Sequence, residues 1–348
     1  MNKIVDMRSD TLTRPTEKMR RAIYEAEVGD DVLGEDPTVN RLEAMAAERT
    51  GKEAAVLVTS GTMSNLVAIL AHTHPGESMI VDHNAHVHLN ECGSAAAFGG
   101  VHTYAVDLDE DCRPSLKNIR AAIRKANVHF PETTLICLEN THNLQGGVCT
   151  NVERTKAVCN MAHENGCKVH IDGARIFNAA MALGVDVAQL AADADSVTFC
   201  LSKGLGAPVG SILNGPKDFI QVARRTRKAL GGGMRQAGII AAAGIVALEE
   251  AEKTVARDNA LAKHFAQALL KEDLIELAPP IPVETNLIWC RPKHCPLPIA
   301  EVPARLKEHG VLLNASPIHN KIRLAVYNAI MEEDLPIVLE AFRHLPRS

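Results

Sequence analysis

The segment TSGTMSN, residues 59–65, has the residue types of a phosphate-binding turn. It follows an apolar run and opens a stretch with helical spacing. The start of a helix offers free N–H groups and the positive end of a dipole to an anion. Gly61 would let the backbone approach a ligand closely, and Ser60 and Thr62 would offer hydroxyl groups. A residue that only caps a helix gives the same pattern, so this segment alone leaves both interpretations open.

The segment VHIDGARIFN, residues 169–178, ends an apolar run with a carboxylate, Asp172. The carboxyl ends of parallel strands line the ligand crevice of an α/β sheet. A carboxylate in that position is costly unless it meets a cation. That cation could belong to a ligand, or it could be Arg175 in a purely structural ion pair.

The segment SVTFCLSKGLGAPVG, residues 196–210, leads a nearly unbroken apolar strand to Ser202 and Lys203. Small residues follow, so the lysine has little surface along which to extend to water. An amine held in such a place is suited to condense with a carbonyl group. Taken alone, this lysine could equally lie at the edge of the core without a catalytic role.

Together the three segments predict a site for pyridoxal phosphate, with a phosphate cup, an acid for the pyridine nitrogen and a lysine for the aldehyde. Asp172 would keep the nitrogen protonated, so that the ring could accept the electron pair released when a bond to Cα breaks. The spacing between Asp172 and Lys203 allows one intervening strand–helix unit. Both residues would then lie on neighbouring strands.

A fourth segment, DHNAHVH at residues 82–88, could be a metal site, a catalytic station or a polar loop. A metal would require His83, His86 and His88, with Asp82, to converge with nitrogen–metal distances of about 2.0–2.1 Å. No further Cys/His pair in the sequence supports a metal.

The composition is that of a globular protein: 348 residues, 46% apolar and 23% charged, with a net charge of −5. This length can bury a large domain and a smaller one. The mild acidity argues against a nucleic-acid partner, and no run approaches the ~20 apolar residues of a membrane span. Nine cysteines without a CxxC pair, and an N-terminus without a targeting pattern, predict a cytoplasmic protein with reduced thiols.

Short apolar runs alternate with amphipathic stretches, which predicts an α/β fold with a mostly parallel central sheet between helices. We expect an N-terminal arm (1–20) that contributes to the site, a large cofactor-binding domain (21–250) and a smaller α+β C-terminal domain (251–348). Strands are predicted at 54–58, 79–81, 134–138, 168–171, 197–201, 285–290, 311–315 and 321–327, and helices at 38–50, 63–72, 115–126, 151–165, 299–309 and 332–344.

Several longer phrases, most of them within residues 6–250, resemble the low-specificity L-threonine aldolases, fold-type-I pyridoxal-phosphate enzymes of the aspartate aminotransferase superfamily. Taken as a set, these phrases are highly specific for that family, whereas the C-terminal third resembles it more in the order of its elements than in sequence motifs. They are MRSDTLTRP (7–15), EVGDDVLGEDPTVNRLE (27–43), TSGTMSN, LENTHN (138–143), VHIDGARIFNA, FCLSKGLGAPVGS and ALGGGMRQAG (229–238).

The resemblance implies pyridoxal 5'-phosphate as the cofactor, bound covalently by Lys203, with Asp172 at the pyridinium. Arg235 would reach the phosphate from a neighbouring subunit of a homo-oligomer, a dimer or a tetramer with shared active sites. His86 would stack over the cofactor ring, which favours one working histidine in DHNAHVH and no metal. The cofactor-binding residues implied in this way are Ser60, Gly61, Thr62, His86, Asp172, Arg175, Ser202, Lys203 and Arg235.

The resemblance also implies the reaction: cleavage of L-threonine or L-allo-threonine to glycine and acetaldehyde. Ser9, Arg175 and Arg323 would hold the substrate carboxylate. His129 would lie near the β-hydroxyl group, and either His86 or His129 could be the base. The alternatives are β-elimination or hydroxymethyl transfer on the same scaffold, or a non-catalytic cofactor-binding protein.

The chain departs from the family pattern at three places. The family commonly has a tyrosine where this chain has Leu33, and aromatic residues where it has Leu89 and Asn90. A segment that often bears a histidine after the carboxylate-binding arginine carries Tyr327 here. We expect all of these residues on the substrate side, where they would affect substrate preference and leave cofactor binding intact.

Overall fold

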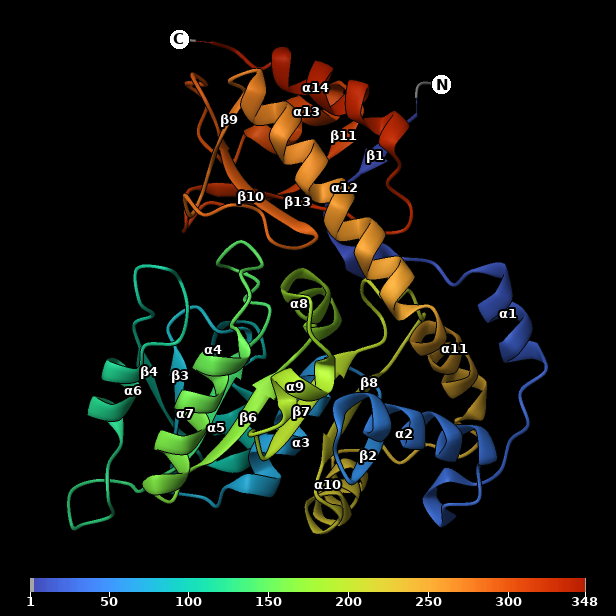
Figure 1. Ribbon diagram of the computed structural model, residues 1–348, viewed down its shortest axis with the longest axis vertical. Helices are drawn as coiled ribbons and strands as arrows, with labels where there is room; N and C mark the ends of the chain where they lie inside the picture. Colours follow the sequence, from blue (N-terminus) through green and yellow to red (C-terminus); the bar gives the residue numbers. More distant parts are fainter. Residues whose placement is uncertain (1–2, 348) are drawn as a thin grey trace.

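The larger part of the protein is built on a seven-stranded sheet with the order β2-β8-β7-β6-β5-β3-β4 (Figure 1). In the computed structural model, which describes residues 3–347, the strands from β7 to β4 are parallel neighbours. Only β8 runs antiparallel to its two neighbours. The predicted mostly parallel sheet is therefore confirmed. The strands are β2 (Ala54–Val58), β3 (Ser78–Asp82), β4 (His102–Val106), β5 (Thr133–Glu139), β6 (Lys168–Asp172), β7 (Ser196–Cys200) and β8 (Ser211–Gly215).

Helices cover both faces of this sheet. Since alternate residues of one strand face opposite ways, each strand packs against helices on both sides. In β2, Val56 packs in one cluster with Val67 and Ile220, whereas Leu57 packs in another cluster with Leu42. Burial on both faces explains why the inner strands are continuous apolar runs. The helices of this part are α1 (Glu17–Tyr24), α2 (Pro37–Thr50), α3 (Gly61–His72), α4 (His86–Leu89), α5 (Ser94–Gly99), α6 (Leu116–Ala122), α7 (Val152–Glu164), α8 (Ile176–Leu183), α9 (Val187–Ala191), α10 (Lys217–Ala229) and α11 (Gly238–Glu249), with 3₁₀ turns η1 (Asp10–Leu12) and η2 (Asp31–Leu33).

Helix α6 ends at Ala122, whereas the sequence pattern predicts a helix that continues to residue 126. The chain becomes extended at Ile123. The backbone N–H and C=O groups of Arg124 then bond to the hydroxyl and the N–H group of Thr133. These bonds give the N–H and C=O groups of Arg124 partners outside a helix, at the start of β5. Helical hydrogen bonds are therefore not needed at this residue.

A second, antiparallel sheet with the order β12-β13-β10-β9 forms the core of the C-terminal part. Helix α12 runs from the first part into the second (Figure 1). The N-terminal strand β1 pairs with β11, and Val5 and Met7 are buried in the same cluster as Phe265. The elements are β1 (Val5–Asp6), β9 (Ile275–Leu277), β10 (Leu287–Pro292), β11 (Val311–Leu312), β12 (Asn314–Ser316), β13 (Lys321–Ala325), α12 (Ala251–Lys271), α13 (Val302–Glu308), α14 (Leu335–Arg343) and η3 (Glu332–Asp334).

The predicted strand at 311–315 is two short strands with different partners. Val311 and Leu312 pair with the N-terminal strand, and Asn314 to Ser316 pair with β13. We propose to keep the division into an arm (1–20), a large domain (21–250) and a small domain (251–348), since α12 begins at Ala251.

Across residues 3–347, none of the helices has the length and apolar character to cross a membrane.

Candidate active site

The three segments singled out by their chemistry meet around one cavity of about 170 Å³. It lies where β6 and β7 end and α3 begins, which is the crevice that a parallel sheet opens at the carboxyl ends of its strands. The cavity is lined by Gly61, Thr62, Asn65, His86, Glu91, Asp172, Ala174, Cys200, Ser202 and Lys203.

The turn at the start of α3 combines a helix cap with a close backbone approach. The Ser60 hydroxyl accepts a hydrogen bond from the Met63 N–H group at 3.2 Å, so Ser60 caps the helix and its oxygen is already engaged. A Cβ atom at Gly61 would lie 2.8 Å from the sulfur of Cys200, so only glycine fits there. The first N–H groups of a helix have no partner within it, which leaves this end open to an anion.

Asp172 is the last residue of β6 and is buried. One of its oxygens accepts from the Ala174 N–H group at 3.0 Å, and the other accepts from the Asn65 amide at 2.9 Å. Burial raises the pKa of this carboxyl group, but the positive charges of Lys203 and His86 outweigh burial and bring the pKa below its ordinary value. Asp172 is therefore a charged acid that faces the cavity.

The alternative ion pair between Asp172 and Arg175 does not form. Arg175 instead makes a bidentate pair with Asp10, at 2.6 and 2.7 Å. Asp10 is fully buried, and the charges of Arg175, Lys203 and Arg323 act together to lower its pKa against the effect of burial. The N-terminal arm thus places one carboxylate among three cations.

Lys203 follows β7 and lines the cavity. Its carbonyl oxygen accepts from the Gly206 N–H group at 2.8 Å and from the Thr13 hydroxyl at 3.2 Å. Gly206 has a φ of +86°, which closes the tight loop after the lysine. These contacts fix the backbone of Lys203, so the amine projects from a rigid loop.

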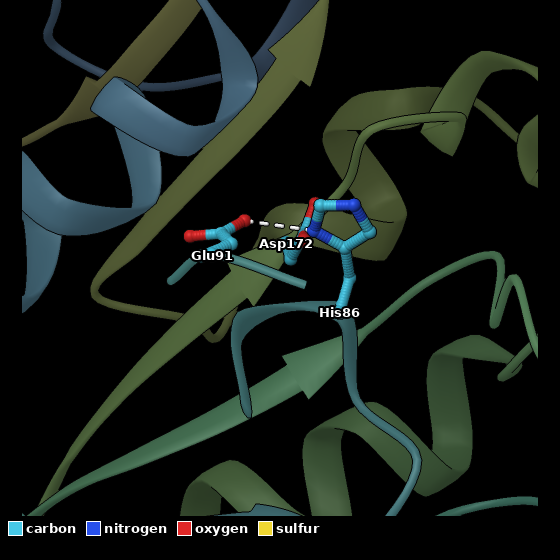
Figure 2. A group of neighbouring side chains, drawn as sticks. All are labelled: His86, Glu91 and Asp172. Carbon is cyan, nitrogen blue, oxygen red and sulfur yellow. Dashed lines mark hydrogen bonds and ion pairs between the residues drawn. The ribbon is translucent and has the colours of Figure 1, made fainter. Parts of the chain in front are cut away.

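His86 lies at the start of α4 and contacts two acids, of which Figure 2 shows Glu91. Its backbone N–H group donates to Glu139 at 2.6 Å, and its Nδ1 atom lies 2.9 Å from Glu91. Burial lowers the pKa of the imidazole, but the hydrogen bond to Glu91 and the charges of Asp172 and Glu139 outweigh it and raise the pKa. Because Nδ1 is engaged, Nε2 is the ring atom that can exchange a proton.

Glu91 and Asp172 are two buried acids close to His86 (Figure 2). One ligand atom from each of the three residues lies within 4.8 Å of the others. Burial and the charge of Asp172 raise the pKa of Glu91. In the part of the chain that the structure describes, the Oε2 atom of Glu91 has no hydrogen-bond partner. The cluster therefore favours a positively charged group in the cavity.

The histidines of DHNAHVH do not converge on one point. Asp82 bonds to His142 at 3.0 Å, and the exposed His83 lies 3.8 Å from Asp107. Of the four residues considered as metal ligands, only His86 lines the cavity. The segment thus contributes a single histidine to the site.

Arg323, on β13, is partly buried and has no acidic hydrogen-bond partner among the described residues. Its guanidinium donates to the Asn143 side chain and to the Arg8 carbonyl, each at 2.9 Å. Within residues 3–347, no carboxylate oxygen bonds to it and its Nε atom has no partner. Burial and the charge of Arg175 lower its pKa to about 10. A partly buried arginine without an acidic partner favours an incoming anion.

Ser9 follows the carbonyl that Arg323 contacts. Its hydroxyl accepts from the N–H and hydroxyl groups of Thr11, at 3.2 and 2.8 Å, and caps η1. Ser9 therefore directly follows Arg8, whose carbonyl Arg323 contacts, but the Ser9 hydroxyl itself caps the η1 turn.

Six residues assigned by resemblance do not line this cavity: Ser9, Ser60, Arg175 and Arg323, described above, and also His129 and Arg235. His129 is exposed in the loop before β5, at the amino end of that strand, whereas the cavity lies at the carboxyl ends of the strands. The His129 ring packs edge-on against Phe130. Arg235 is exposed and pairs with Asp30 at 2.8 Å. Neither residue lines the cavity of its own chain.

Tyr327 does not lie on the substrate side, which corrects the prediction from the sequence. It is buried in the second core, and its hydroxyl donates to the Asp6 carbonyl at 2.9 Å. Leu33, Leu89 and Asn90 are exposed and are not among the residues that line the cavity.

Sequence reasoning missed Asn65 and Glu91. Asn65 was visible as the last residue of TSGTMSN, one helical turn after Gly61 and therefore on the same face of the helix. Glu91 had no such signal, because the chain leaves α4 at Asn90 before it returns to the cavity.

Solved structures show which class of protein has this fold. A Leishmania major threonine aldolase structure matches with a TM-score of 0.80 at 19% identity, over 97% of this chain and 98% of that one. A putative L-allo-threonine aldolase from Listeria monocytogenes matches with a TM-score of 0.79 at 20% identity, over 97% and 95%. The fold is that of the fold-type-I pyridoxal-phosphate enzymes.

Sequence comparisons identify the family. The beta-eliminating lyase model matches residues 6–291. Low-specificity L-threonine aldolase 1 of Arabidopsis thaliana is 46% identical over 97% of this chain and 95% of its own length. The low specificity L-threonine aldolase of Escherichia coli K12 is 41% identical over 98% of both. The chain belongs to the beta-eliminating lyase family and, within it, to the low-specificity L-threonine aldolases.

Glu91→Gln should shift the acid limb of the pH–activity profile. The amide keeps the shape and an acceptor oxygen for His86 but removes the charge that raises the pKa of His86. If the neutral imidazole is the base, activity is lost as the pH falls through its pKa, so a lower pKa moves the acid limb to lower pH, by about one unit. The measurement is kcat/KM from pH 5 to 9, and an unmoved limb would rule His86 out as the base.

Proposed function

We propose that this protein is a pyridoxal-phosphate-dependent aldolase that cleaves L-threonine and L-allo-threonine to glycine and acetaldehyde. The observation that carries the proposal is the cavity itself, in which Lys203 and charged Asp172 face one another beside the open end of α3. The aldolases among its relatives, at 41–46% identity over nearly the whole chain, support the same reaction.

The residues around the cavity fit this cofactor. Asp172, Glu91 and His86 surround a point that favours a positive charge, as a protonated pyridine nitrogen would provide. A phosphate would lie at the start of α3, where Gly61, Thr62 and Ser202 line the cavity. When bound, pyridoxal phosphate supplies an aldehyde that captures amines and a ring that accepts an electron pair from Cα.

The chain's own groups would divide the remaining work. Arg323 would bind the substrate carboxylate, near the charge of the Arg175–Asp10 pair. Asp172 would hold a proton on the ring nitrogen through a charge-assisted hydrogen bond. The Nε2 atom of His86 would take the proton of the β-hydroxyl group, directly or through a water molecule. Fixing the carboxylate would orient the bond to be broken.

His129 and Arg235 could serve such a site only from a neighbouring copy. Both are exposed and lie outside the cavity of their own chain. We therefore include in the proposal a homo-oligomer with shared sites, a dimer or a homotetramer. We also propose a cytoplasmic location, which is supported by free cysteines throughout the described chain.

The test is a product assay. Purified protein loaded with pyridoxal phosphate should release glycine and acetaldehyde in equal amounts from L-threonine and from L-allo-threonine. β-Elimination is the second candidate, because the matching family is the beta-eliminating lyases. Ammonia with a keto acid would support elimination, and dependence on a one-carbon acceptor would support hydroxymethyl transfer. Bound cofactor without any turnover would indicate a non-catalytic binding protein and would refute the proposal.

A further inference from the structure

A row of polar side chains runs through the interior behind Asp172. It joins Asn65 and His72 of α3 to His170 of β6 and Ser196 of β7. Asn65 Oδ1 lies 3.1 Å from His170 Nε2, His170 Nδ1 lies 2.8 Å from Ser196 Oγ, and Ser196 Oγ lies 2.8 Å from His72 Nε2. Asn65, His170 and Ser196 are each at most 2% exposed. These side chains do not react, and the mechanism above gives them no role.

The direction of the hydrogen bonds follows from the two acids at the front of the row. The Nδ2 group of Asn65 donates to Asp172 at 2.9 Å and to Glu91 at 2.8 Å. Since both of its protons are used, the amide oxygen must accept. His170 must then carry a proton on Nε2 and donate it to Asn65.

The remaining hydrogen bonds of the row have donors and acceptors that agree with this assignment. Burial lowers the pKa of His170 to about 4, so the imidazole is neutral and its Nδ1 atom accepts from the Ser196 hydroxyl. The Ser196 oxygen can then accept from His72, whose ring stacks on Phe219 at 4.3 Å. Each hydrogen bond of the row therefore has a fixed donor and a fixed acceptor, and the Asn65 amide can point only one way.

We propose that Asn65 is a positioning residue for both acids of the site and that His170 sets its orientation. One amide group holds Asp172 and Glu91 together, although like charges this close would otherwise repel and turn apart. Both acids then face the same positive group, which is the pyridine nitrogen if the proposed function is correct. The inference depends on the proposed function only in naming the pyridine nitrogen as the positive group that the two acids face.

The kinetic test compares two replacements of His170. Glutamine can still donate to Asn65 and accept from Ser196, whereas phenylalanine can do neither. His170→Phe and Asn65→Ala should each lower kcat by about 10- to 100-fold with little change in KM, because a hydrogen bond to a charged group is lost while substrate binding stays. His170→Gln should retain activity within about threefold. Asn118→Ala, which removes a partly exposed asparagine that donates to the Asp107 carbonyl, is the matched control and should leave kcat unchanged.

A structural test is independent of turnover. In crystals of the full-length His170→Phe protein, the contact between Asn65 and Asp172 should be lost or the amide rotated, whereas His170→Gln should keep it. If His170→Phe does not fold, Ser196→Ala breaks the same row by removing one oxygen atom and should show a smaller displacement. An unmoved Asn65 in these variants, with unchanged kcat, would overturn the proposal. Failure of the proposed function would appear separately, as absence of turnover in the unmodified protein.

Discussion

Lys203→Ala should abolish both the visible absorbance of bound pyridoxal phosphate and the release of glycine from L-threonine. Lys203 is the lysine that lines the cavity with Asp172, and its backbone is fixed by Thr13 and Gly206. Removing a member of a catalytic group typically costs at least about 10⁴-fold in kcat, which would leave turnover at background. Absorbance spectra of the purified variant and a glycine assay provide the two measurements.

Lys18→Ala is the matched control. Lys18 is an exposed lysine that pairs with Glu249 and Glu250 on the surface, so its loss should leave absorbance and turnover unchanged. Unfolding curves of both variants should resemble that of the unmodified protein. Full glycine release from a correctly folded Lys203→Ala protein would overturn the assignment of the site.

Arg323→Gln should raise the KM for L-threonine by about 100-fold, because truncating one partner of a buried, hydrogen-bonded charge pair costs on the order of 2–5 kcal/mol. The guanidinium has no acidic partner among residues 3–347, and burial lowers its pKa to about 10, so the cost of burying its charge is offset only when an anion binds. Arg323→Lys should recover only part of the affinity, since an ammonium group cannot form a bidentate pair with a carboxylate. Steady-state kinetics with L-threonine give the two KM values.

Arg291→Gln is the appropriate comparison in the same sheet. Arg291 lies on β10 at the surface, where it bonds to the Asn320 carbonyl and to Glu276. Its replacement should leave KM unchanged. If Arg323→Gln also kept KM within about threefold, the substrate carboxylate would have to bind elsewhere.

The N-terminal segment places a buried carboxylate, Asp10, near the charged residues of the candidate site. Asp10 pairs with Arg175 of the large domain and accepts a hydrogen bond from Asn286 of the C-terminal part at 3.1 Å. The same acid feels the charges of Lys203 and Arg323, which lower its pKa. It therefore joins the N-terminal segment to both parts of the protein and balances the positive charge of Arg175, Lys203 and Arg323.

The sequence predicted five of the seven strands of the sheet and missed β4 at one edge and β8 inside it. Strands β2, β3, β5, β6 and β7 are apolar runs, because helices cover them on both sides. Strand β4 is half exposed at the edge and its residues alternate in burial, so its pattern is weaker. Strand β8 is antiparallel to both of its neighbours, so no crossover helix announces it.

By itself the sequence determined which residues stand at the ends of strands and at the start of α3, because apolar runs, glycines and polar residues at their boundaries are local signals. Those signals were sufficient to place Asp172, Lys203 and Gly61 around one crevice. Only the tertiary structure decided that Arg175 pairs with Asp10, that Glu91 contacts the His86 ring, and that His129 lies at the amino end of β5, away from the cavity. Such pairings depend on the three-dimensional packing of distant segments, which no local spacing records.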